Sequence, residues 1–389
     1  MNNEGMREMK DFSLPYGHQS IAEKDIEAVA AVLRGDWLTM GPAVERFESA
    51  VADYVGAACA VSFSSGTAAL HGAMHAAGVV PGDRVIVPPL TFAATANAAL
   101  YCGGEPVFAD ISPGTLCLDP WEAESVAASP GGPVRVIAPV SFAGFPADIS
   151  TFRGLSARMG AVIVEDACHA LGARRGELWV GKEADMTVFS FHPVKHITTA
   201  EGGMVVTDSE EFAKRLRRFR THGIVKSPAD FERPYEGPWD NDMIELGYNY
   251  RLSDMASALG ESQMRRLDAF VARRRELAVL YAEALGDVSE VDLPPDHPGH
   301  SYHIFPVAFP AKRRKEIFLS LRSAGIGVQV HYPPVHKHTY YRRRFGDRDG
   351  KFPITETYAQ RTISLPMFPD MSNEDVSLVV RHVKEALCG

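Results

Sequence analysis

Cysteine is scarce in this chain, and the few cysteines form no recognisable pattern. The 389 residues include five cysteines, none in a C-x-x-C pair or at metal-ligand spacing: Cys59, Cys102, Cys117, Cys168 and Cys388. An odd number of scattered thiols argues against both a zinc module and a disulfide framework. We therefore expect no metal site, and we expect free thiols in a reducing cytoplasm.

Long apolar runs and an excess of positive charge are also missing. No apolar stretch approaches the roughly 20 residues of a membrane-spanning helix, and the leader MNNEGMREMKDF lacks the apolar centre of a signal peptide. The net charge of -9 offers no basic surface to nucleic acid or to an anionic membrane. We expect a soluble cytoplasmic protein with neither kind of partner.

Valine- and isoleucine-rich runs alternate with helical segments through the first half of the chain. The runs are CAVSF, RVIVPP, PVFADI, VRVIAPVSF and AVIVED. Strands of this kind, separated by helices, predict a mostly parallel sheet that is buried on both faces. Ligands bind at the carboxyl ends of such strands. We therefore expect the turn Ser64–Thr67, the ring of Phe92 and the carboxylate of Asp166 to face one crevice.

The remaining segments predict further helices and a second domain. Ser20 and Glu23 form a possible capping box for a first helix, and Ser253 to about Leu285 is helical in one or two pieces. Beyond it, HSYHIFPVAF and IGVQVHY predict strands, PPVHKHTYYRRR predicts a basic loop, and a capped helix begins at Ser372. With 389 residues available, we predict a large cofactor-binding domain over 1–260 and a smaller one over 261–389.

A phosphate-binding turn is one interpretation of the segment that follows CAVSF. There the strand runs through Ser64, Ser65, Gly66 and Thr67 into a helix of small residues. Unpaired backbone N–H groups and the positive end of the helix dipole favour an anion at such a point. The plainer interpretation is an ordinary helix cap, because serine and threonine are favoured there in any case.

Lys195 lies between two predicted strands, in the segment MTVFSFHPVKHITTAEGGMVVTD. Burial disfavours the charged form of an amine, which helps a lysine to attack an aldehyde. Alone, Lys195 is as well explained by a surface loop, and Asp166 by a helix cap. Together with Gly66–Thr67 and Phe92, however, they match the needs of pyridoxal phosphate. That cofactor requires a phosphate cradle, a flat side chain against its ring, a carboxylate at its ring nitrogen and a lysine at its aldehyde.

Five segments resemble a known family of enzymes. They are SSGTAAL, LTFAATANAA, EDACHALGA, FSFHPVKHITTAEGGMVVTD and GYNYRLSDMASALG. They are similar to the aminotransferases of the aspartate-aminotransferase fold that act on keto-sugar nucleotides. The resemblance implies an α/β protein of fold type I, with a mostly parallel central sheet flanked by helices and a smaller α+β C-terminal domain. The segments DWLTMGP, ELGYNYRLSD and HYPPVH are most similar to the branch that aminates C4 in the pseudaminic acid pathway.

The resemblance also implies roles for particular residues. Lys195 would form the Schiff base with pyridoxal 5'-phosphate, and Asp166 would pair with the ring nitrogen. The other implied cofactor contacts are Gly66, Thr67, Phe92, His169, Ser190 and Asn249, the last reaching across from a neighbouring subunit. The implied substrate contacts are Tyr16, Asp36, Trp37, Leu38, Thr39, Gly66, Ser190, His192, Asn249, Tyr332, Pro333, Pro334 and Val335. Arg251, two residues after Asn249, is our hypothesis for a glutamate carboxylate.

The reaction implied is transfer of an amino group from glutamate to the C4 keto group of a UDP-linked 2-acetamido-2,6-dideoxy-hexos-4-ulose, by a homodimer with shared active sites. Another 4-keto or 3-keto sugar nucleotide is an open alternative, as used for lipid A, O-antigen or antibiotic sugars. Lys195 argues against the related dehydratase branch, which has histidine at that position. A non-catalytic regulator of the same fold would have little reason to keep both Asp166 and Lys195.

Overall fold

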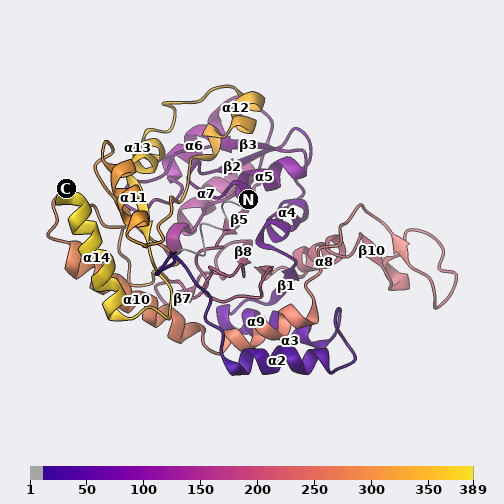
Figure 1. Cartoon of the computed structure of the whole chain (residues 1–389). Helices are drawn as coiled ribbons and strands as arrows, with labels where there is room; N and C mark the ends of the chain where they lie inside the picture. Colours follow the sequence, from indigo (N-terminus) through magenta and orange to yellow (C-terminus); the bar gives the residue numbers. More distant parts are fainter. Residues whose placement is uncertain (1–11, 389) are drawn as a thin grey trace.

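A seven-stranded sheet forms the centre of the computed structural model, which describes residues 12–388 (Figure 1). Its strand order is β1-β9-β8-β5-β4-β2-β3, and the neighbours from β8 to β3 are parallel. Only β9, between β1 and β8, is antiparallel, because a helix-free loop joins β8 to β9. The strands are β1 (Cys59–Phe63), β2 (Arg84–Val87), β3 (Glu105–Phe108), β4 (Val134–Ile137), β5 (Val162–Asp166), β8 (Met186–Ser190) and β9 (Gly203–Thr207).

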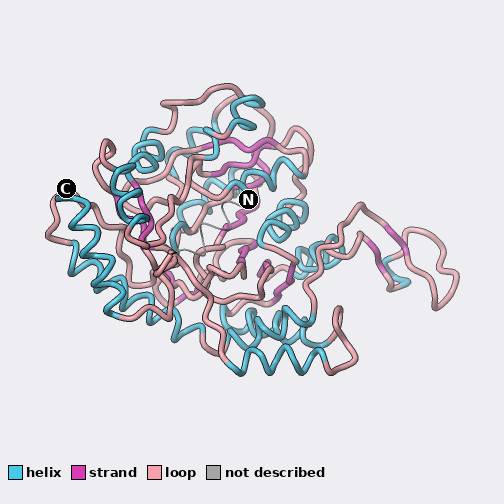
Figure 2. Tube along the Cα trace, in the orientation of Figure 1, coloured by secondary structure: helices cyan, strands magenta, loops and turns pink. Residues whose placement is uncertain are grey.

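Helices cover both faces of this sheet (Figure 2). Successive residues of β2 bury on opposite sides: Val85 and Val87 pack with α4 and α5, whereas Ile86 packs with α6 and α7. The mostly parallel α/β sheet predicted from the sequence is confirmed. The helices of this part are α2 (Glu23–Leu33), α3 (Pro42–Val55), α4 (Gly66–Ala76), α5 (Ala93–Tyr101), α6 (Pro120–Ala128), α7 (Ser150–Met159), α8 (Glu210–Phe219) and α9 (Asp254–Met264).

The C-terminal part has its own hydrophobic core, and one helix belongs to both cores. Phe270 and Val271, early in α10 (Leu267–Leu285), pack with β8 and β9, whereas Leu277 and Tyr281 pack with the C-terminal elements. Those elements are β12 (Phe305–Ala308), α11 (Arg314–Ser323), α12 (Thr339–Phe345), α13 (Pro353–Arg361), β13 (Thr362–Leu365) and α14 (Asn373–Cys388). The expected two helical pieces are confirmed as α9 and α10, while a domain boundary at residue 260 stays a prediction.

Short elements complete the fold, and two of them extend away from the body. β10 (Ile224–Val225) and β11 (Asp242–Met243) pair in an arm beyond α8, where Trp239 is 77% and Leu246 is 73% exposed (Figure 1). β6 (Arg174–Arg175) and β7 (Leu178–Trp179) form a small hairpin, and the 3-10 turns are η1 (Phe142–Gly144), η2 (Pro228–Asp230) and η3 (Val335–Lys337). Within residues 12–388, no helix is long and apolar enough to cross a membrane. Residues 1–11 of the polar leader lie outside the described part.

Helix caps differ in part from those expected. The first helix is capped by Ala22 and Asp25 rather than by Ser20 and Glu23, with the Ala22 N–H donating to Asp25 at 2.9 Å. Ser20 is instead held by its backbone carbonyl, which accepts a hydrogen bond from Gln263 on α9. The box at α14 is confirmed, because the Ser372 N–H donates to Asp375 and the Asp375 N–H donates to the Ser372 hydroxyl.

Two predictions for the C-terminal part are wrong. IGVQVHY forms no strand, because Ile326 bridges Leu14 whereas Gln329 bridges Ser364, so no continuous ladder develops. The expected basic loop PPVHKHTYYRRR is largely helical, in η3 and α12. Its helical form buries Tyr341, whose hydroxyl donates to Asn97 at 2.7 Å. The segment is therefore helical because one of its faces packs against the protein. Its basic composition indicated only that its charged side chains would be exposed.

Candidate active site

A cavity of about 490 Å³ lies at the carboxyl ends of β1, β5 and β8. Most of the residues predicted from the sequence line it, although they come from separate parts of the chain. They are Tyr16, Gly66, Thr67, Phe92, Asp166, His169, Ser190, His192, Lys195 and Tyr332. The expectation that unrelated strand ends face one crevice is therefore correct, and the volume suits a small organic ligand.

Asp166 ends strand β5 with its carboxylate buried at 5% exposure. One carboxylate oxygen accepts a hydrogen bond from the Thr95 hydroxyl at 2.6 Å, and the other accepts one from the Cys168 N–H at 3.1 Å. Thr95 is in turn 2.7 Å from the Thr91 hydroxyl. The two hydrogen bonds thus orient the carboxylate, and its negative charge can still pair with a group in the cavity.

Lys195 lies in the turn after β8, half-buried, with its amine facing the cavity. Burial lowers the pKa of this amine, and the nearby Cys168 and Asp166 offset the shift in part. Its closest polar partner is the His303 ring, with Nζ and Nε2 3.4 Å apart. No sequence pattern singled out His303, since it comes from a segment 108 residues away.

The first turn of α4 forms one end of the cavity. Ser65 caps it by accepting a hydrogen bond from the Ala68 N–H, which leaves the first N–H groups of the helix free for an anion. Gly66 meets the cavity without a side chain, and a Cβ there would lie 3.0 Å from the Cβ of Ser190. The missing side chain keeps the backbone of α4 open to a ligand.

Aromatic and histidine rings form the opposite walls. Phe92 is 58% exposed and lies 5.8 Å from the Tyr332 ring. The Tyr332 hydroxyl is 3.0 Å from Nε2 of His169, whose Nδ1 accepts from the Ala143 N–H. Burial holds the pKa of His169 well below its usual range and raises the pKa of Tyr332. His169 follows Asp166 in a non-helical turn and reaches the cavity.

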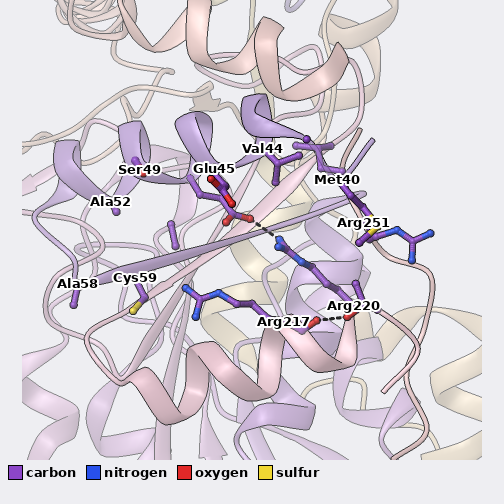
Figure 3. Close-up of a pocket in the computed structure, with 15 residues that line it drawn as sticks. Met40, Val44, Glu45, Ser49, Ala52, Ala58, Cys59, Arg217, Arg220 and Arg251 are labelled. Carbon is purple, nitrogen blue, oxygen red and sulfur yellow. Dashed lines mark hydrogen bonds and ion pairs between the residues drawn. The ribbon is translucent and has the colours of Figure 1, made fainter. Parts of the chain in front are cut away.

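A second group of predicted residues lies outside this cavity. Trp37 and Leu38 are exposed, and the backbone of Asn249 bridges Thr221. Arg251 lines another cavity, of about 570 Å³, together with Met40 (Figure 3). Figure 3 shows Arg217 of α8 and Arg220, the residue directly after α8, reaching into the same space, where Arg220 pairs with Glu48 of α3. Among the other predicted contacts, Pro333 is exposed, whereas Pro334 and Val335 are buried, Val335 in the main core. The predicted roles of these residues stay predictions.

One cluster of possible metal ligands outside this cavity is already paired with a lysine ammonium group. Possible ligand atoms of His336, Asp349 and Glu356 lie within 4.8 Å of one another. The Lys337 amine, however, is 2.8 Å from Glu356 and 3.7 Å from Asp349. A metal ion would have to displace this ammonium group, so the cluster is explained as an ion-pair network.

The residues around Lys195 fit pyridoxal phosphate. The cradle at Gly66 suits a phosphate, the oriented Asp166 carboxylate suits a protonated ring nitrogen, and Phe92 presents a flat ring. The half-buried amine of Lys195, with its lowered pKa, suits an aldehyde. Fold and site together define a fold type I aminotransferase that uses pyridoxal phosphate.

Comparison with known proteins agrees with this class. Residues 19–384 match the model of the DegT/DnrJ/EryC1/StrS aminotransferase family, and the chain belongs to that family. It is 36% identical over 391 aligned positions to the spore coat polysaccharide biosynthesis protein SpsC of Bacillus subtilis, covering 99% of this chain and 100% of SpsC. It is 38% identical over 390 positions to the UDP-4-amino-4,6-dideoxy-N-acetyl-beta-L-altrosamine transaminase of Campylobacter jejuni, covering 97% and 100% of the two chains.

Solved structures give the same result. Helicobacter pylori PseC, an aminotransferase involved in the biosynthesis of pseudoaminic acid, superposes with a TM-score of 0.88 at 28% identity, covering 96% of this chain and 98% of PseC. The PMP form of a sugar aminotransferase from Streptococcus pneumoniae also reaches 0.88, at 27% identity and with 96% and 99% coverage. The protein is a sugar aminotransferase that uses pyridoxal phosphate, a sugar substrate and an amino donor.

Proposed function

We propose that this enzyme transfers the amino group of glutamate to the C4 keto group of a UDP-linked 2-acetamido-2,6-dideoxy-hexos-4-ulose of L-arabino configuration. The product is UDP-4-amino-4,6-dideoxy-N-acetyl-β-L-altrosamine, in pseudaminic acid biosynthesis, and the reaction takes place in the cytoplasm. The observation that carries the proposal is the 38% identity to the Campylobacter transaminase over the full length of that enzyme. The match to PseC supports it independently.

We propose a task in this reaction for each residue around the cavity. Bound pyridoxal phosphate supplies an aldehyde that bonds to amines and a ring that accepts electron density from the substrate carbon. The first turn of α4 and Ser190 bind the phosphate, and Asp166 keeps a proton on the ring nitrogen. Lys195 Nζ would carry the proton between the carbon that bears the amine and the aldehyde carbon of the cofactor. Phe92 and Tyr332 orient the rings and exclude water from the reacting atoms.

We infer further that two chains share their active sites. The predicted contacts fall into two separate groups, one around Lys195 and one with Trp37, Asn249 and Arg251. In a homodimer, the second group of one protomer completes the cavity of the other, and Arg251 then meets a carboxylate of glutamate. Mixing inactive Lys195→Ala chains with Asn249→Ala chains tests this arrangement. Each hybrid dimer has one intact site of its two, and about half of the dimers in a 1:1 mixture are hybrids, so the mixture should regain up to about a quarter of the activity. Mixtures that stay inactive would argue against shared sites.

Cofactor attachment is tested without any sugar. The purified protein should be yellow, and borohydride should fix the cofactor on Lys195, as peptide mass spectrometry would show. Lys195→Ala should keep its fold and lose this attachment. A protein that stays colourless with added pyridoxal phosphate would contradict the assigned site.

The sugar is tested with a substrate panel. We expect the UDP-4-keto sugar of L-arabino configuration to be aminated with a kcat/KM at least about tenfold above its D-xylo isomer, a difference of about 1.4 kcal/mol in transition-state binding. Preference for the D-xylo isomer would instead favour a different amino sugar. The 36% identity to SpsC supports that second candidate, an aminotransferase for another surface-polysaccharide sugar.

A further inference from the structure

The His303 ring is the hydrogen-bond partner of the Lys195 amine. His303 was not among the site residues predicted from the sequence. Its ring is 3% exposed, and Nε2 lies 3.4 Å from Nζ of Lys195. The ring packs against His169, with centroids 4.4 Å apart, and against His196 at 5.7 Å. The imidazole therefore has little freedom to turn away from the amine.

The backbone of His303 is held from two sides. Its N–H donates to the Ala143 carbonyl at 2.8 Å. Its carbonyl accepts a hydrogen bond at 3.0 Å from Arg274, a fully buried side chain of α10 that also donates to the Tyr302 and Met367 carbonyls. The position of the ring is thus set by the frame of the protein.

The two ring nitrogens of His303 have different surroundings, which fixes the tautomer. Among residues 12–388, Nδ1 has no hydrogen-bond partner and is buried, whereas Nε2 faces Lys195. A proton on Nδ1 would be a buried donor without an acceptor, which is rare and costly. A neutral ring therefore carries its proton on Nε2. Burial is the main cause that lowers the pKa of His303, so the ring is neutral.

An Nε2–H group needs an acceptor, and only the unprotonated amine of lysine provides one. An ammonium group has three donors and no lone pair. We propose that His303 is a positioning residue that donates a hydrogen bond from Nε2 to Nζ of Lys195 and so holds this amine in its unprotonated, reactive form. The other titratable groups that face Lys195 are Asp166, Cys168, His169, His192, His196, His331 and Tyr332.

The proposal rests on the use of pyridoxal phosphate and is independent of the sugar. The test therefore uses full-length protein freed of cofactor, to which pyridoxal phosphate is added at a series of pH values. The rate at which the bound cofactor turns yellow rises with pH as Lys195 loses its proton. In His303→Leu, we expect the midpoint of this profile to move up by about one pH unit, with a rate about tenfold lower below it.

Three matched variants make the outcome specific. His303→Gln can donate through its amide and should keep a midpoint near that of the wild type. The asparagine side chain in His303→Asn is too short to reach Nζ, so the midpoint should shift as in His303→Leu. If His303→Leu does not fold, His303→Asn is used in its place. His196→Gln removes another buried imidazole, whose Nε2 contacts the Ser301 carbonyl, and should leave the midpoint in place. An unshifted midpoint in both His303→Leu and His303→Asn, or an equal shift in His303→Gln or His196→Gln, would overturn the proposal.

Discussion

At the scale of single residues, Thr95 determines how Asp166 faces the cavity. Thr95 is fully buried on α5, and its hydroxyl connects Thr91 to the Asp166 carboxylate. A carboxylate held in this way loses little freedom when a cation approaches its open side. Thr95 therefore supports the carboxylate that we propose for the ring nitrogen of the cofactor, although Thr95 does not end a strand.

Replacing Thr95 by valine keeps the shape and removes this hydrogen bond. A hydrogen bond to a charged group contributes about 1.5–3 kcal/mol, so we expect cofactor affinity to fall about tenfold to a hundredfold. Equilibrium dialysis with pyridoxal phosphate measures the change. Thr95→Ser, which keeps the hydroxyl, is the control and should bind within about threefold of the wild type. Equal affinity of all three proteins would remove Thr95 from the site.

The sequence predicts the positions of site residues best where they lie next to a strand with a strong local sequence pattern. Asp166 ends a strand and Lys195 lies in the turn after one, and both strands are recognisable from their own residues. Thr95 and His303 were missed, since each owes its place to contacts across 71 and 108 residues of sequence. Such contacts depend on packing between distant elements, and a single sequence carries no local sign of them.

At the scale of elements, strand β5 carries two carboxylates that point to opposite faces. Asp166 faces the cavity, whereas Glu165 is fully buried and pairs with Arg175 of the β6–β7 hairpin. Glu165 also accepts a hydrogen bond from Ser141 at 2.5 Å. Burial raises the pKa of Glu165, and Arg175 acts in the opposite direction. The hairpin thus supplies the charge that keeps the end of β5 in place.

Removing Arg175 should lower the free energy of unfolding strongly, because it leaves the buried carboxylate of Glu165 without a positively charged partner. For Arg175→Met we expect the free energy of unfolding to fall by about 3–5 kcal/mol, as measured by urea denaturation. The double variant with Glu165→Gln, which carries no buried charge, should recover much of the loss. The single variant should also regain stability as the pH is lowered, because protonation of Glu165 removes its charge. A loss below about 0.5 kcal/mol would show that the pair contributes nothing.

At the scale of the whole molecule, buried histidines make stability depend on pH. Burial lowers the pKa of His300 and of His331 to about 3, and that of His71 to about 4. Between these values and the ordinary pKa of about 6.5, the unfolded chain binds protons that the folded chain does not. Stability from these groups is complete above pH 6.5 and is lost as the pH falls through this window.

Each such histidine contributes a slope of at most about 1.4 kcal/mol per pH unit. We therefore expect the melting temperature to fall steeply from pH 6.5 towards pH 4, as followed by calorimetry. His300→Asn, which can still accept the hydrogen bond from the Tyr302 N–H, should give a shallower decline. Identical slopes for variant and wild type would mean that His300 titrates normally in the fold.

The other limit of sequence reasoning appears at the same scale. Trp37, Asn249 and Arg251 were predicted to contact ligand, yet in a single chain they lie away from Lys195. Only Asn249 was expected to act from a neighbouring subunit; the motifs that contain Trp37 and Arg251 do not record which copy of the chain would use them. The same holds for the arm around β10 and β11, whose exposed tryptophan no local pattern explains.

Helix α10 has a consequence for how the enzyme selects its sugar. The helix is embedded in both cores, and its Arg274 fastens the backbone beside Lys195 from within. Outward movement of the segment that carries His303 would break the hydrogen bonds from Arg274 to the Tyr302 and His303 carbonyls. We therefore expect a preformed, rigid substrate site rather than one that closes around the sugar. A stereoisomer would be rejected because its hydroxyl groups clash with this rigid surface.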